Sequence, residues 1–305
     1  MDFFPFPKIV ARPGPLPGGP WVATEKVHGA NFVVGIDGPF TYFGKRRAWL
    51  HPDEPFFGWQ LVRAYVGDGV RAVAHDLGVT QLFAYGELCG GAYPHPEVPP
   101  APGLAPVQTG VWYCPDIHWV LFDLLMVREG HPEWVDWSTM VKVAARHGLF
   151  TSPVLGRGNR TILEQLPVEF PSRVHQHFGL PPIEGNLAEG LVLRTERGGA
   201  FRVLFKKKHP SFDEARFGEA EAWAPPYLGV AELSYWANRL VNPARISSAR
   251  SKVGTGVQEI AEEVALDVAI DIDTTFPDGW SALGAEGQER VLSETRARAV
   301  MLASG

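Results

Sequence analysis

The spacing of hydrophobic residues divides the chain into a strand-rich first part and a helix-rich last part. Apolar runs bracketed by turn residues predict two short strands within 21–36, around a tight turn at His28-Gly29. Asp37-Gly38 is a hairpin signal, so a return strand is expected at 40–45. Further strands are predicted at 81–88, 118–127, 190–195 and 200–207.

Helical spacing is present in both parts and dominates after Pro226. We therefore place a domain boundary near 224–226 and expect domains at 1–224 and 225–305. A loop is expected at 93–110, which holds six prolines. The expected helices are 59–77 (with a Gly-Asp-Gly interruption), 138–147, 161–166, 230–240, 257–270 and 285–302.

Composition is that of an ordinary globular protein, with 45% hydrophobic and 20% charged residues. A length of 305 residues suggests roughly two domains. No run of 18 apolar residues predicts a membrane span, and the first ten residues do not resemble a signal peptide. Two cysteines, Cys89 and Cys114, cannot build a disulfide framework or a four-thiolate zinc site, so we expect a cytoplasmic protein.

The net charge of −6 is unevenly distributed along the chain. Residues 255–305 hold ten acidic and three basic side chains, a net of −7, which leaves about +1 for the first 254 residues. This balance argues against a non-specific coat for nucleic acid. It is compatible with phosphate contacts through local basic clusters.

Lys26 is the sharpest candidate for chemistry, in the sequence Glu25-Lys26-Val27-His28-Gly29. A lysine at a strand end can project its amine into a cleft, and a lysine whose pKa is lowered can act as a covalent nucleophile. Taken alone, this short sequence is more typical of a surface lysine before a turn.

Four further motifs, three at the ends of predicted strands and one inside a buried strand, supply the remaining groups that nucleotidyl transfer requires. Carboxylates for a divalent cation, an aromatic ring for a base and lysines for a phosphate are all present. Each motif alone is unremarkable, and it is the combination that favours nucleotidyl transfer. The motifs are Tyr85-Gly86-Glu87-Leu88, Leu121-Phe122-Asp123-Leu124, Glu189-Gly190-Leu191-Val192-Leu193-Arg194 and Phe205-Lys206-Lys207-Lys208.

In order and content these motifs resemble the RNA ligase 2 branch of the covalent nucleotidyltransferase superfamily, which includes DNA ligases and mRNA capping enzymes. The Lys-x-x-Gly core is Lys26 to Gly29, and Gly44-Lys45-Arg46-Arg47 best matches motif Ia. DNA ligases and capping enzymes usually carry Asp where this chain has His28. The resemblance extends from about Val22 to Phe212.

The resemblance implies a role for each matched residue. Lys26 would carry the nucleotide, Glu87 would contact the ribose and Phe122 would stack on the adenine. Glu189 would help to bind the metal, while Lys206 and Lys208, which alternate along one strand face, would hold the α-phosphate. The remaining nucleotide-binding candidates are Glu25, His28, Asn31 and Arg46, with Arg47 left open as an alternative to Arg46.

The implied fold is α+β, with an antiparallel two-sheet nucleotidyltransferase domain of the ATP-grasp-like ligase type and a small helical C-terminal domain. The implied activity is ATP-dependent joining of RNA 3′-hydroxyl and 5′-phosphate ends, with Mg²⁺ or Mn²⁺. It would proceed through a lysyl-AMP intermediate and an adenylylated 5′ end. RNA, most naturally as a nicked duplex, is the expected partner, and RNA repair is the expected setting.

The C-terminal part is expected to engage RNA. Residues 238–252 contain four basic side chains and no acidic one, namely Arg239, Arg245, Arg250 and Lys252. The alternative is that these residues only balance the acidic helices that follow.

Other functions remain open at this point. A DNA or mixed-substrate ligase and a GTP-using capping-type enzyme share the motifs, and a nucleic-acid end-binding protein without catalysis is the alternative outside enzymes. The histidines His175, His177 and His209 are expected at the surface or beside a site rather than on a metal. Packing is the expected role of Trp112, Trp119, Trp134 and Trp137.

Overall fold

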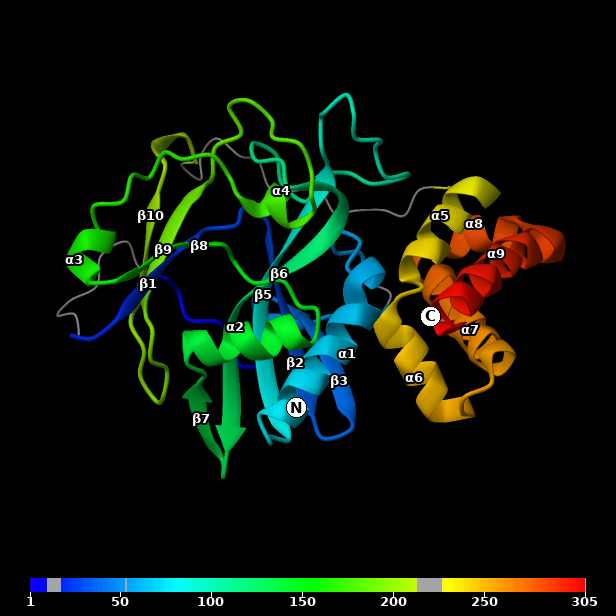
Figure 1. Cartoon of the computed structure of the whole chain (residues 1–305), viewed down its shortest axis with the longest axis horizontal. Helices are drawn as coiled ribbons and strands as arrows, with labels where there is room; N and C mark the ends of the chain where they lie inside the picture. Colours follow the sequence, from blue (N-terminus) through cyan, green and yellow to red (C-terminus); the bar gives the residue numbers. More distant parts are fainter. Residues whose placement is uncertain (10–17, 53, 213–226, 305) are drawn as a thin grey trace. The chain divides into compact units, whose positions relative to one another are not determined.

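The computed structural model describes residues 1–9, 18–52, 54–212 and 227–304 (Figure 1). It divides into two compact units. The first comprises Met1–Leu50, Gly69–Pro100 and Ala105–Glu221, and the second comprises His51–Asp68, Ala101–Leu104 and Ala222–Gly305. The boundary expected near 224–226 lies outside the described residues. The second unit also takes in two segments from the first part of the chain.

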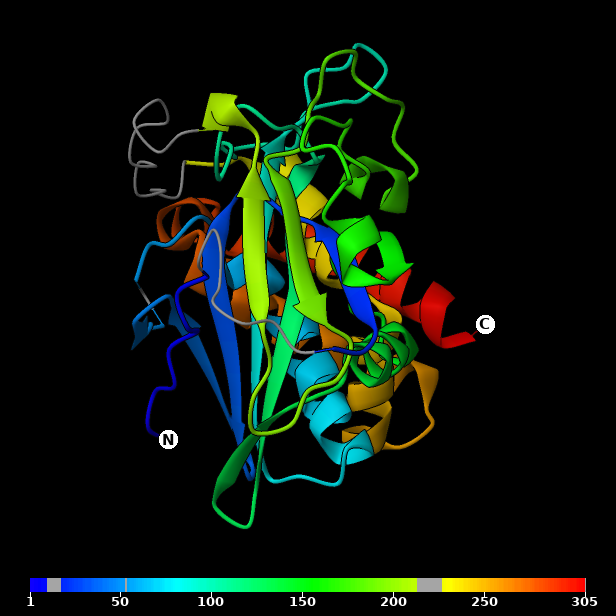
Figure 2. The ribbon, with the colours of Figure 1, turned by 90° about the vertical axis from the view of Figure 1, so that its left-hand side faces the viewer.

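Two antiparallel sheets form the first unit, which confirms the predicted α+β class. The four-stranded sheet has the order β10-β9-β1-β8, and β9 and β10 lie side by side in Figure 2. Its strands are β1 (Trp21–Glu25), β8 (Val154–Gly158), β9 (Gly190–Thr195) and β10 (Leu204–Lys208). The six-stranded sheet runs β4-β3-β2-β5-β6-β7. Its strands are β2 (Ala30–Asp37), β3 (Phe40–Lys45), β4 (Ala48–Trp49), β5 (Gln81–Ala92), β6 (Cys114–Arg128) and β7 (His131–Trp134).

The two strands predicted within 21–36 are present, but they do not pair with each other. Strand β1 pairs with β8 and β9, whereas β2 pairs with β3 and β5 in the other sheet. Residues 26–29 therefore carry the chain from one sheet to the other. Lys26 lies in this passage.

Helix α1 (Gln60–Asp76) is continuous through the Gly-Asp-Gly sequence that predicted an interruption. Its apolar stripe explains the continuity, because Val62, Val66, Val70 and Val73 are all buried at helical spacing. Residues 93–110 contain neither helix nor strand, as expected. The helices that lie wholly within the first unit are α2 (Trp137–Arg146), α3 (Arg160–Leu163), α4 (Val174–His177) and a short 3₁₀ helix at Pro210–Phe212.

Tryptophans fill much of the core of the first unit. Trp119 and Trp137 are fully buried, and the Trp119 indole donates a hydrogen bond of 3.0 Å to the Phe32 carbonyl oxygen on a neighbouring element. Trp134 is also buried, whereas Trp112 is only half-buried. The packing role expected of these residues is therefore confirmed for three of the four.

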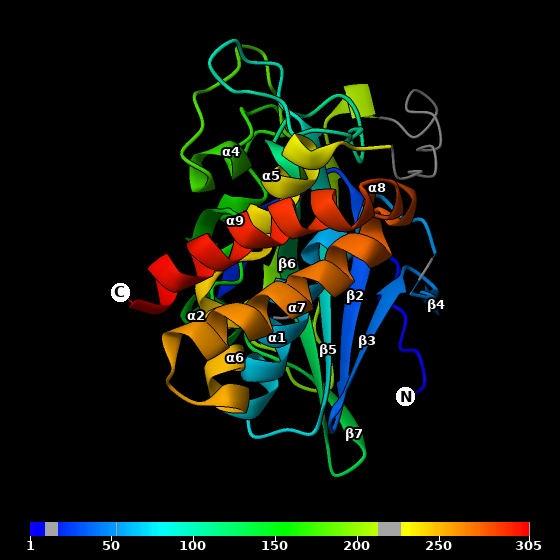
Figure 3. The same ribbon diagram turned by 90° about the vertical axis from the view of Figure 1, so that its right-hand side faces the viewer.

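Five helices follow in the second unit: α5 (Val230–Leu240), α6 (Pro243–Val253), α7 (Val257–Thr275), α8 (Pro277–Ala282) and α9 (Gly284–Ser304). Figure 3 shows the two long helices α7 and α9 lying side by side. Helix α6 was not predicted. It begins where the Asn242 side chain accepts a hydrogen bond of 3.0 Å from the Arg245 backbone N–H. Among the described residues, no helix has the length and apolarity that crossing a bilayer requires.

Candidate active site

The carboxylate of Glu189 lies at the centre of the candidate site. Its Oε2 is 2.5 Å from Lys26 Nζ and 3.4 Å from His28 Nδ1, while its Oε1 is 2.8 Å from Lys208 Nζ. The Glu189 side chain is only 2% exposed. Two segments, 26–28 and the end of β10, therefore converge on one buried carboxylate.

Strand pairing explains this convergence. Strand β9 follows Glu189 and lies between β1 and β10, so that Leu191 faces Glu25 on one side and Gly190 faces Lys208 on the other. The backbone N–H of Lys26 donates to the Gly190 carbonyl oxygen at 2.9 Å, and that of His209 donates to the Glu189 carbonyl oxygen at 2.9 Å. These bonds fix the backbone around Glu189 on both sides.

The neighbouring cations keep Glu189 ionised. Burial by itself raises the pKa of Glu189, but the contact with His28 and the ammonium groups of Lys26 and Lys208 outweigh it. Together they hold the pKa well below the usual carboxyl range. A buried anion of this kind can hold an amine in place or bind a divalent cation.

Glu87 is a second acid of the site, and its pKa is shifted in the opposite direction from that of Glu189. Burial raises the pKa of Glu87 to about 7, because the positive charges of Lys26 and Arg46 and a hydrogen bond from the Gly29 N–H compensate only in part. Asn31 is the cross-strand partner of Glu87, so both side chains point to one face of the sheet. The Asn31 Oδ1 is buried without a hydrogen-bond partner among the described residues.

The positions of Gly29 and Arg46 bear on two sequence predictions. A Cβ atom on Gly29 would lie 1.9 Å from the Leu88 carbonyl oxygen, so only glycine fits against strand β5. Arg46 lies in the turn between β3 and β4, and its charge acts on Glu87. This favours Arg46 over Arg47 as the motif Ia arginine.

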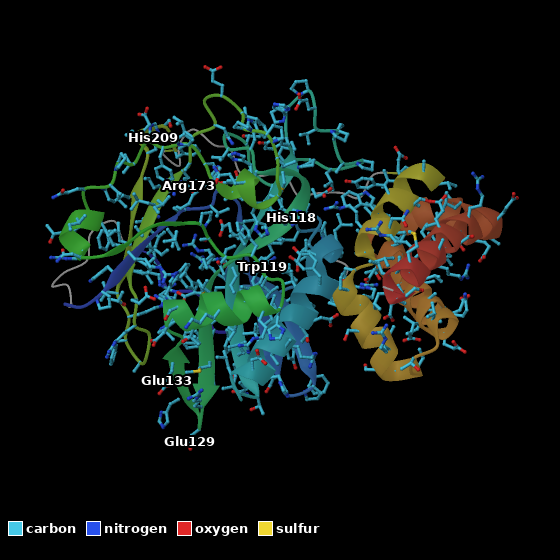
Figure 4. The ribbon with its side chains drawn as sticks, viewed as in Figure 1. His118, Trp119, Glu129, Glu133, Arg173 and His209 are labelled. Carbon is cyan, nitrogen blue, oxygen red and sulfur yellow. The ribbon has the colours of Figure 1, made fainter. Side chains whose placement is uncertain are left out.

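Glu25 is buried at 1% exposure and turned away from solvent by a loop from later in the chain. Its Oε1 accepts from the Ser172 hydroxyl at 2.6 Å, and its Oε2 accepts from the Arg173 backbone N–H at 2.8 Å. Burial raises the pKa of Glu25 to about 7, opposed by these hydrogen bonds. Figure 4 shows Arg173 and His209 toward the same end of the first unit.

Sequence reasoning missed Ser172 and Tyr113. The Tyr113 hydroxyl accepts a hydrogen bond of 2.7 Å from the His28 backbone N–H, and its ring belongs to a buried cluster with Val27 and Cys89. Both residues lie in loops with no strand or helix pattern of their own. No local signal in the sequence connects them with the lysine motif.

The lysines of β10 alternate as predicted. Lys208 faces Glu189, whereas Lys207 Nζ donates to the carbonyl oxygens of Glu164 at 2.8 Å and Leu166 at 3.1 Å. Lys206 lies two residues from Lys208 and therefore on the same face of the strand. Phe122 lies on β6, half-buried, with its ring centroid 5.0 Å from that of Phe6.

The histidines contact ordinary protein groups. His175 is buried, His177 stacks on Phe150 at 3.7 Å between ring centroids, and His209 Nε2 lies 3.3 Å from Glu169 Oε2. Within the described ranges, no group of three or more His, Cys, Asp or Glu side chains is placed to hold a metal ion. A divalent cation fits the site only in the manner of Mg²⁺, which needs one or two carboxylates and takes further oxygens from substrate phosphates and water.

The expected RNA contacts of the second unit need correction. Arg245 is 5% exposed and pairs with Asp271 of α7, which also accepts from Arg63 Nη2 at 2.7 Å. Lys252 Nζ lies 2.8 Å from Glu263 and 3.3 Å from Asp267. The segment lacks acids in sequence, but the packing of α6 against α7 supplies them. Arg245 is therefore a buried structural residue and the prediction that it contacts RNA is wrong.

The other two basic residues of that segment are placed differently. Arg250 Nη2 donates to the Ala303 carbonyl oxygen at 3.1 Å, and the Arg239 guanidinium lies 6.0 Å from the centroid of the Tyr235 ring. Both side chains are exposed, in contrast to the buried Arg245.

Comparison with known proteins assigns the class. The model of the RNA ligase family matches residues 19–208, a range that contains every residue of the site from Lys26 to Lys208. The chain belongs to the RNA ligase family.

Two curated relatives are mitochondrial RNA-editing ligases of Trypanosoma brucei brucei. RNA-editing ligase 2 is 31% identical over 208 residues, which cover 59% of this chain and 49% of the relative. RNA-editing ligase 1 is 30% identical over 218 residues, covering 59% and 45%. The chain spans about half the length of these relatives.

Solved structures with a similar arrangement include variants of the Naegleria gruberi RNA ligase. One, with ATP and Mn, has a TM-score of 0.45 and 15% identity, covering 65% of this chain and 52% of that one. Another, with AMP and Mn, has a TM-score of 0.44 and 14% identity over the same shares.

Proposed function

We propose that the chain is an ATP-dependent RNA ligase that joins 3′-hydroxyl and 5′-phosphate ends through a lysyl-AMP intermediate. The observation that carries the proposal is the Glu189 carboxylate held between Lys26 and Lys208. It combines a nucleophilic amine, an anion and a second cation within one small buried cluster. Membership of the RNA ligase family supports RNA as the substrate.

In the first step, the Lys26 ammonium group gives up a proton to water, and the resulting amine attacks the α-phosphorus of ATP and releases a second proton to water. A P–N bond forms as the bond to the β-phosphate oxygen breaks, and pyrophosphate leaves. Lys206 and Lys208 offset negative charge on the α-phosphate in the transition state. A divalent cation, held by Glu189 with substrate phosphates, would favour the neutral amine and screen the phosphate charge.

Two transfers complete the reaction. An oxygen of the RNA 5′-phosphate attacks the AMP phosphorus, so that the P–N bond to Lys26 breaks and a pyrophosphate linkage forms on the RNA. The 3′-hydroxyl of the other end then attacks the 5′-phosphorus, a phosphodiester forms and AMP leaves. The same two strand lysines serve both transfers, since each again places charge on the AMP phosphate.

The nucleoside would occupy the side of the site that Glu87 and Asn31 face. Glu87 is proposed to contact the ribose, and the unpaired Asn31 Oδ1 marks an acceptor available to a ligand. Phe122 is proposed to stack on the adenine, with Glu25, Ser172 and Arg173 bordering the base.

The first experiment asks which nucleotide becomes attached to the protein. Purified chain is incubated with α-labelled ATP or GTP and Mg²⁺ or Mn²⁺, and the attached mass is measured. AMP attachment is expected, and Lys142→Ala, which removes an exposed lysine of α2, serves as the matched control for Lys26→Ala. GMP attachment would indicate a capping-type enzyme, and no attachment would favour an end-binding protein.

The second experiment identifies the polynucleotide. Matched substrates are offered as nicked duplex RNA, RNA on a DNA template, single-stranded RNA and nicked DNA, and sealing is measured on each. We expect sealing of RNA, with the nicked duplex favoured. Preferential sealing of nicked DNA would contradict the substrate class.

A role of the second unit in RNA engagement is proposed for its exposed candidates Arg239, Arg250 and Lys252, of which the two arginines give the clearest test. If they contact phosphates, Arg239→Ala and Arg250→Ala should each lower the slope of log K against log salt by about one. Lys26 adenylylation should stay at the parent level. A parent-like salt slope in both variants would leave RNA engagement to the first unit.

A further inference from the structure

Asp123 is a buried acid that none of the proposed steps uses. Its Oδ1 lies 2.9 Å from Arg194 Nη2 and its Oδ2 lies 2.6 Å from Arg202 Nη2. All three side chains are nearly inaccessible, at 1%, 4% and 2% exposure. Asp123 lies on β6 of the six-stranded sheet. Arg194 lies on β9 of the four-stranded sheet, and Arg202 lies in the segment that precedes β10. The cluster therefore fastens one sheet to the other.

The residue before Asp123 is the proposed base-stacking ring, and it occupies an irregular position. Tyr85 of β5 faces Asp123 and the next residue, Gly86, faces Leu121, so Phe122 is the extra residue of a β-bulge. The Phe122 carbonyl oxygen accepts a hydrogen bond of 2.8 Å from Arg194 Nη1. Bulges re-aim a side chain, and this one is held by arginine contacts to Phe122 and Asp123.

Arg202 also reaches Phe122 by a second route. Its guanidinium lies 3.5 Å from the centroid of the Trp134 ring and 5.1 Å from that of Phe6. The Phe6 ring meets Phe122 edge-on at 5.0 Å and Trp134 edge-on at 5.7 Å. Arg202 is thus joined to Phe122 through the ion pair with Asp123 and through the stack on Phe6.

We propose that Arg202 is a positioning residue for nucleotide binding, because it fixes the Phe122 ring through Asp123 and Phe6. The inference rests on the proposed function, since it takes Phe122 as the ring that stacks on the base. Strand β9 gives the arrangement its use: Glu189 precedes this strand and Arg194 lies on it. Strand β9 therefore positions both Glu189, at the phosphate end of the site, and Arg194, which contacts Phe122 at the base end.

The chemistry of the guanidinium explains why arginine stands at this position. Two arginines and one aspartate leave a net positive charge in the interior, and the faces of Trp134 and Phe6 offset it through cation–π contacts. A lysine could pair with Asp123 but could not lie flat on the Trp134 ring at the same time. Lysine should therefore preserve part of the effect.

The test measures the rate of Lys26 adenylylation in a single turnover as a function of ATP concentration for Arg202→Ala and Arg202→Lys, where KM is the half-saturating ATP concentration and kcat the rate constant at saturation. Arg197→Ala is the matched control, because Arg197 is an exposed arginine in the same connection between β9 and β10. We expect KM to rise about tenfold in Arg202→Ala, which is about 1.4 kcal/mol of binding free energy, with kcat within about twofold of the parent. Arg202→Lys should show a smaller rise, and Arg197→Ala none.

A double-mutant cycle separates positioning from a general loss of stability. If Arg202 acts through the ring, Arg202→Ala should change KM by less than about twofold when Phe122→Ala is already present. A tenfold rise in that background, or a parent-like KM in Arg202→Ala, overturns the inference. Thermal unfolding is recorded for every variant, so that the kinetics are measured on folded protein.

Two further results have defined meanings. If Arg202→Ala does not fold, Arg202→Lys carries the test, and a parent-like KM in that variant overturns the inference. A parent chain that takes up no AMP defeats the proposed function itself. An adenylylated parent with an insensitive Arg202 defeats only this inference.

Discussion

Lys208 Nζ lies 2.8 Å from Glu189 Oε1, on the carboxylate oxygen opposite the one that Lys26 contacts. One anion thus holds the proposed nucleophile and a proposed phosphate-binding cation together. The Lys26 and Lys208 side chains are 20% and 24% exposed, so water can reach the position that either amine vacates, and Glu189 keeps one cationic partner. Single lysine substitutions at this site should therefore report mainly on chemistry, unlike substitution of a fully buried arginine.

Lys26→Ala should abolish adenylylation of the protein and leave the fold intact. The variant should still seal an RNA whose 5′ end is already adenylylated, because the AMP is then in place without the lysine. Labelling with α-labelled ATP and sealing of the pre-adenylylated RNA are the two measurements. Undiminished labelling of Lys26→Ala, next to the Lys142→Ala control, would remove Lys26 as the nucleophile.

Substitutions along β10 should separate neighbouring lysines. Lys206→Ala, Lys208→Ala and Glu189→Ala should each lower the adenylylation rate by about 10² to 10³, as expected for loss of a positioned charge. Lys207→Ala should affect the rate much less, because its amine bonds to the Glu164 and Leu166 carbonyl oxygens. It should instead cost about 1 kcal/mol of unfolding free energy. Equal rate losses in Lys206→Ala and Lys207→Ala would contradict this division.

Arg245→Ala should destabilise the protein. It leaves the buried Asp271 with Arg63 alone, and breaking a buried ion pair costs on the order of 3 kcal/mol. Lys252→Ala, which breaks exposed pairs, should cost about 1 kcal/mol or less. Denaturant unfolding measures both, and similar small values for the two variants would argue against the burial of Arg245.

Stability should fall with rising pH through Glu25. Burial raises its pKa to about 7, so the folded state binds the proton more tightly than the unfolded state, where the pKa is about 4.5. The stabilisation is complete below about pH 4.5 and is lost as pH rises toward 7, with a total of about 3 kcal/mol.

The difference in unfolding free energy between the parent and Glu25→Gln isolates this contribution. It should change across pH 5 to 7 and level off above about pH 7. Glu97→Gln, at an exposed glutamate, is the control and should track the parent at every pH. A constant difference between the parent and Glu25→Gln would show that Glu25 does not titrate in this range.

Much of the site could be predicted because its motifs lie in or beside short strands and strand alternation is local. Lys206 and Lys208 share a face for that reason alone. The pairing of strands that are distant in sequence could not be predicted. Nothing in residues 21–36 indicates that β1 and β2 belong to different sheets. Ser172 and Arg202 are likewise recognised only through their partners Glu25 and Asp123, which lie far away in the chain.

Helices α4, α6 and α8 were not predicted, and α6 is the longest of them. Asn242 followed by Pro243 is a start signal for a helix, with Asn as the cap and Pro in the first turn, so α6 could have been found. The basic residues of this segment instead led to the prediction of an RNA-binding surface. The burial of Arg245 could not be read from the segment, because its partner Asp271 lies on the next helix.

The Lys-x-x-Gly spacing sets the length of the connection between the two sheets, because residues 26–29 join β1 to β2. At one end the Lys26 N–H is bonded to Gly190 of the four-stranded sheet, and at the other Gly29 touches the backbone of β5 at Leu88. The four residues 26–29 therefore have a fixed length between the four-stranded sheet and the six-stranded sheet. Adding or removing one residue would shift the Lys26 amine by about 3 Å along the chain, comparable to its whole separation from Glu189. The position of the Lys26 amine is thus fixed by the backbone contacts of Lys26 and Gly29 with the two sheets, whichever nucleotide the site holds.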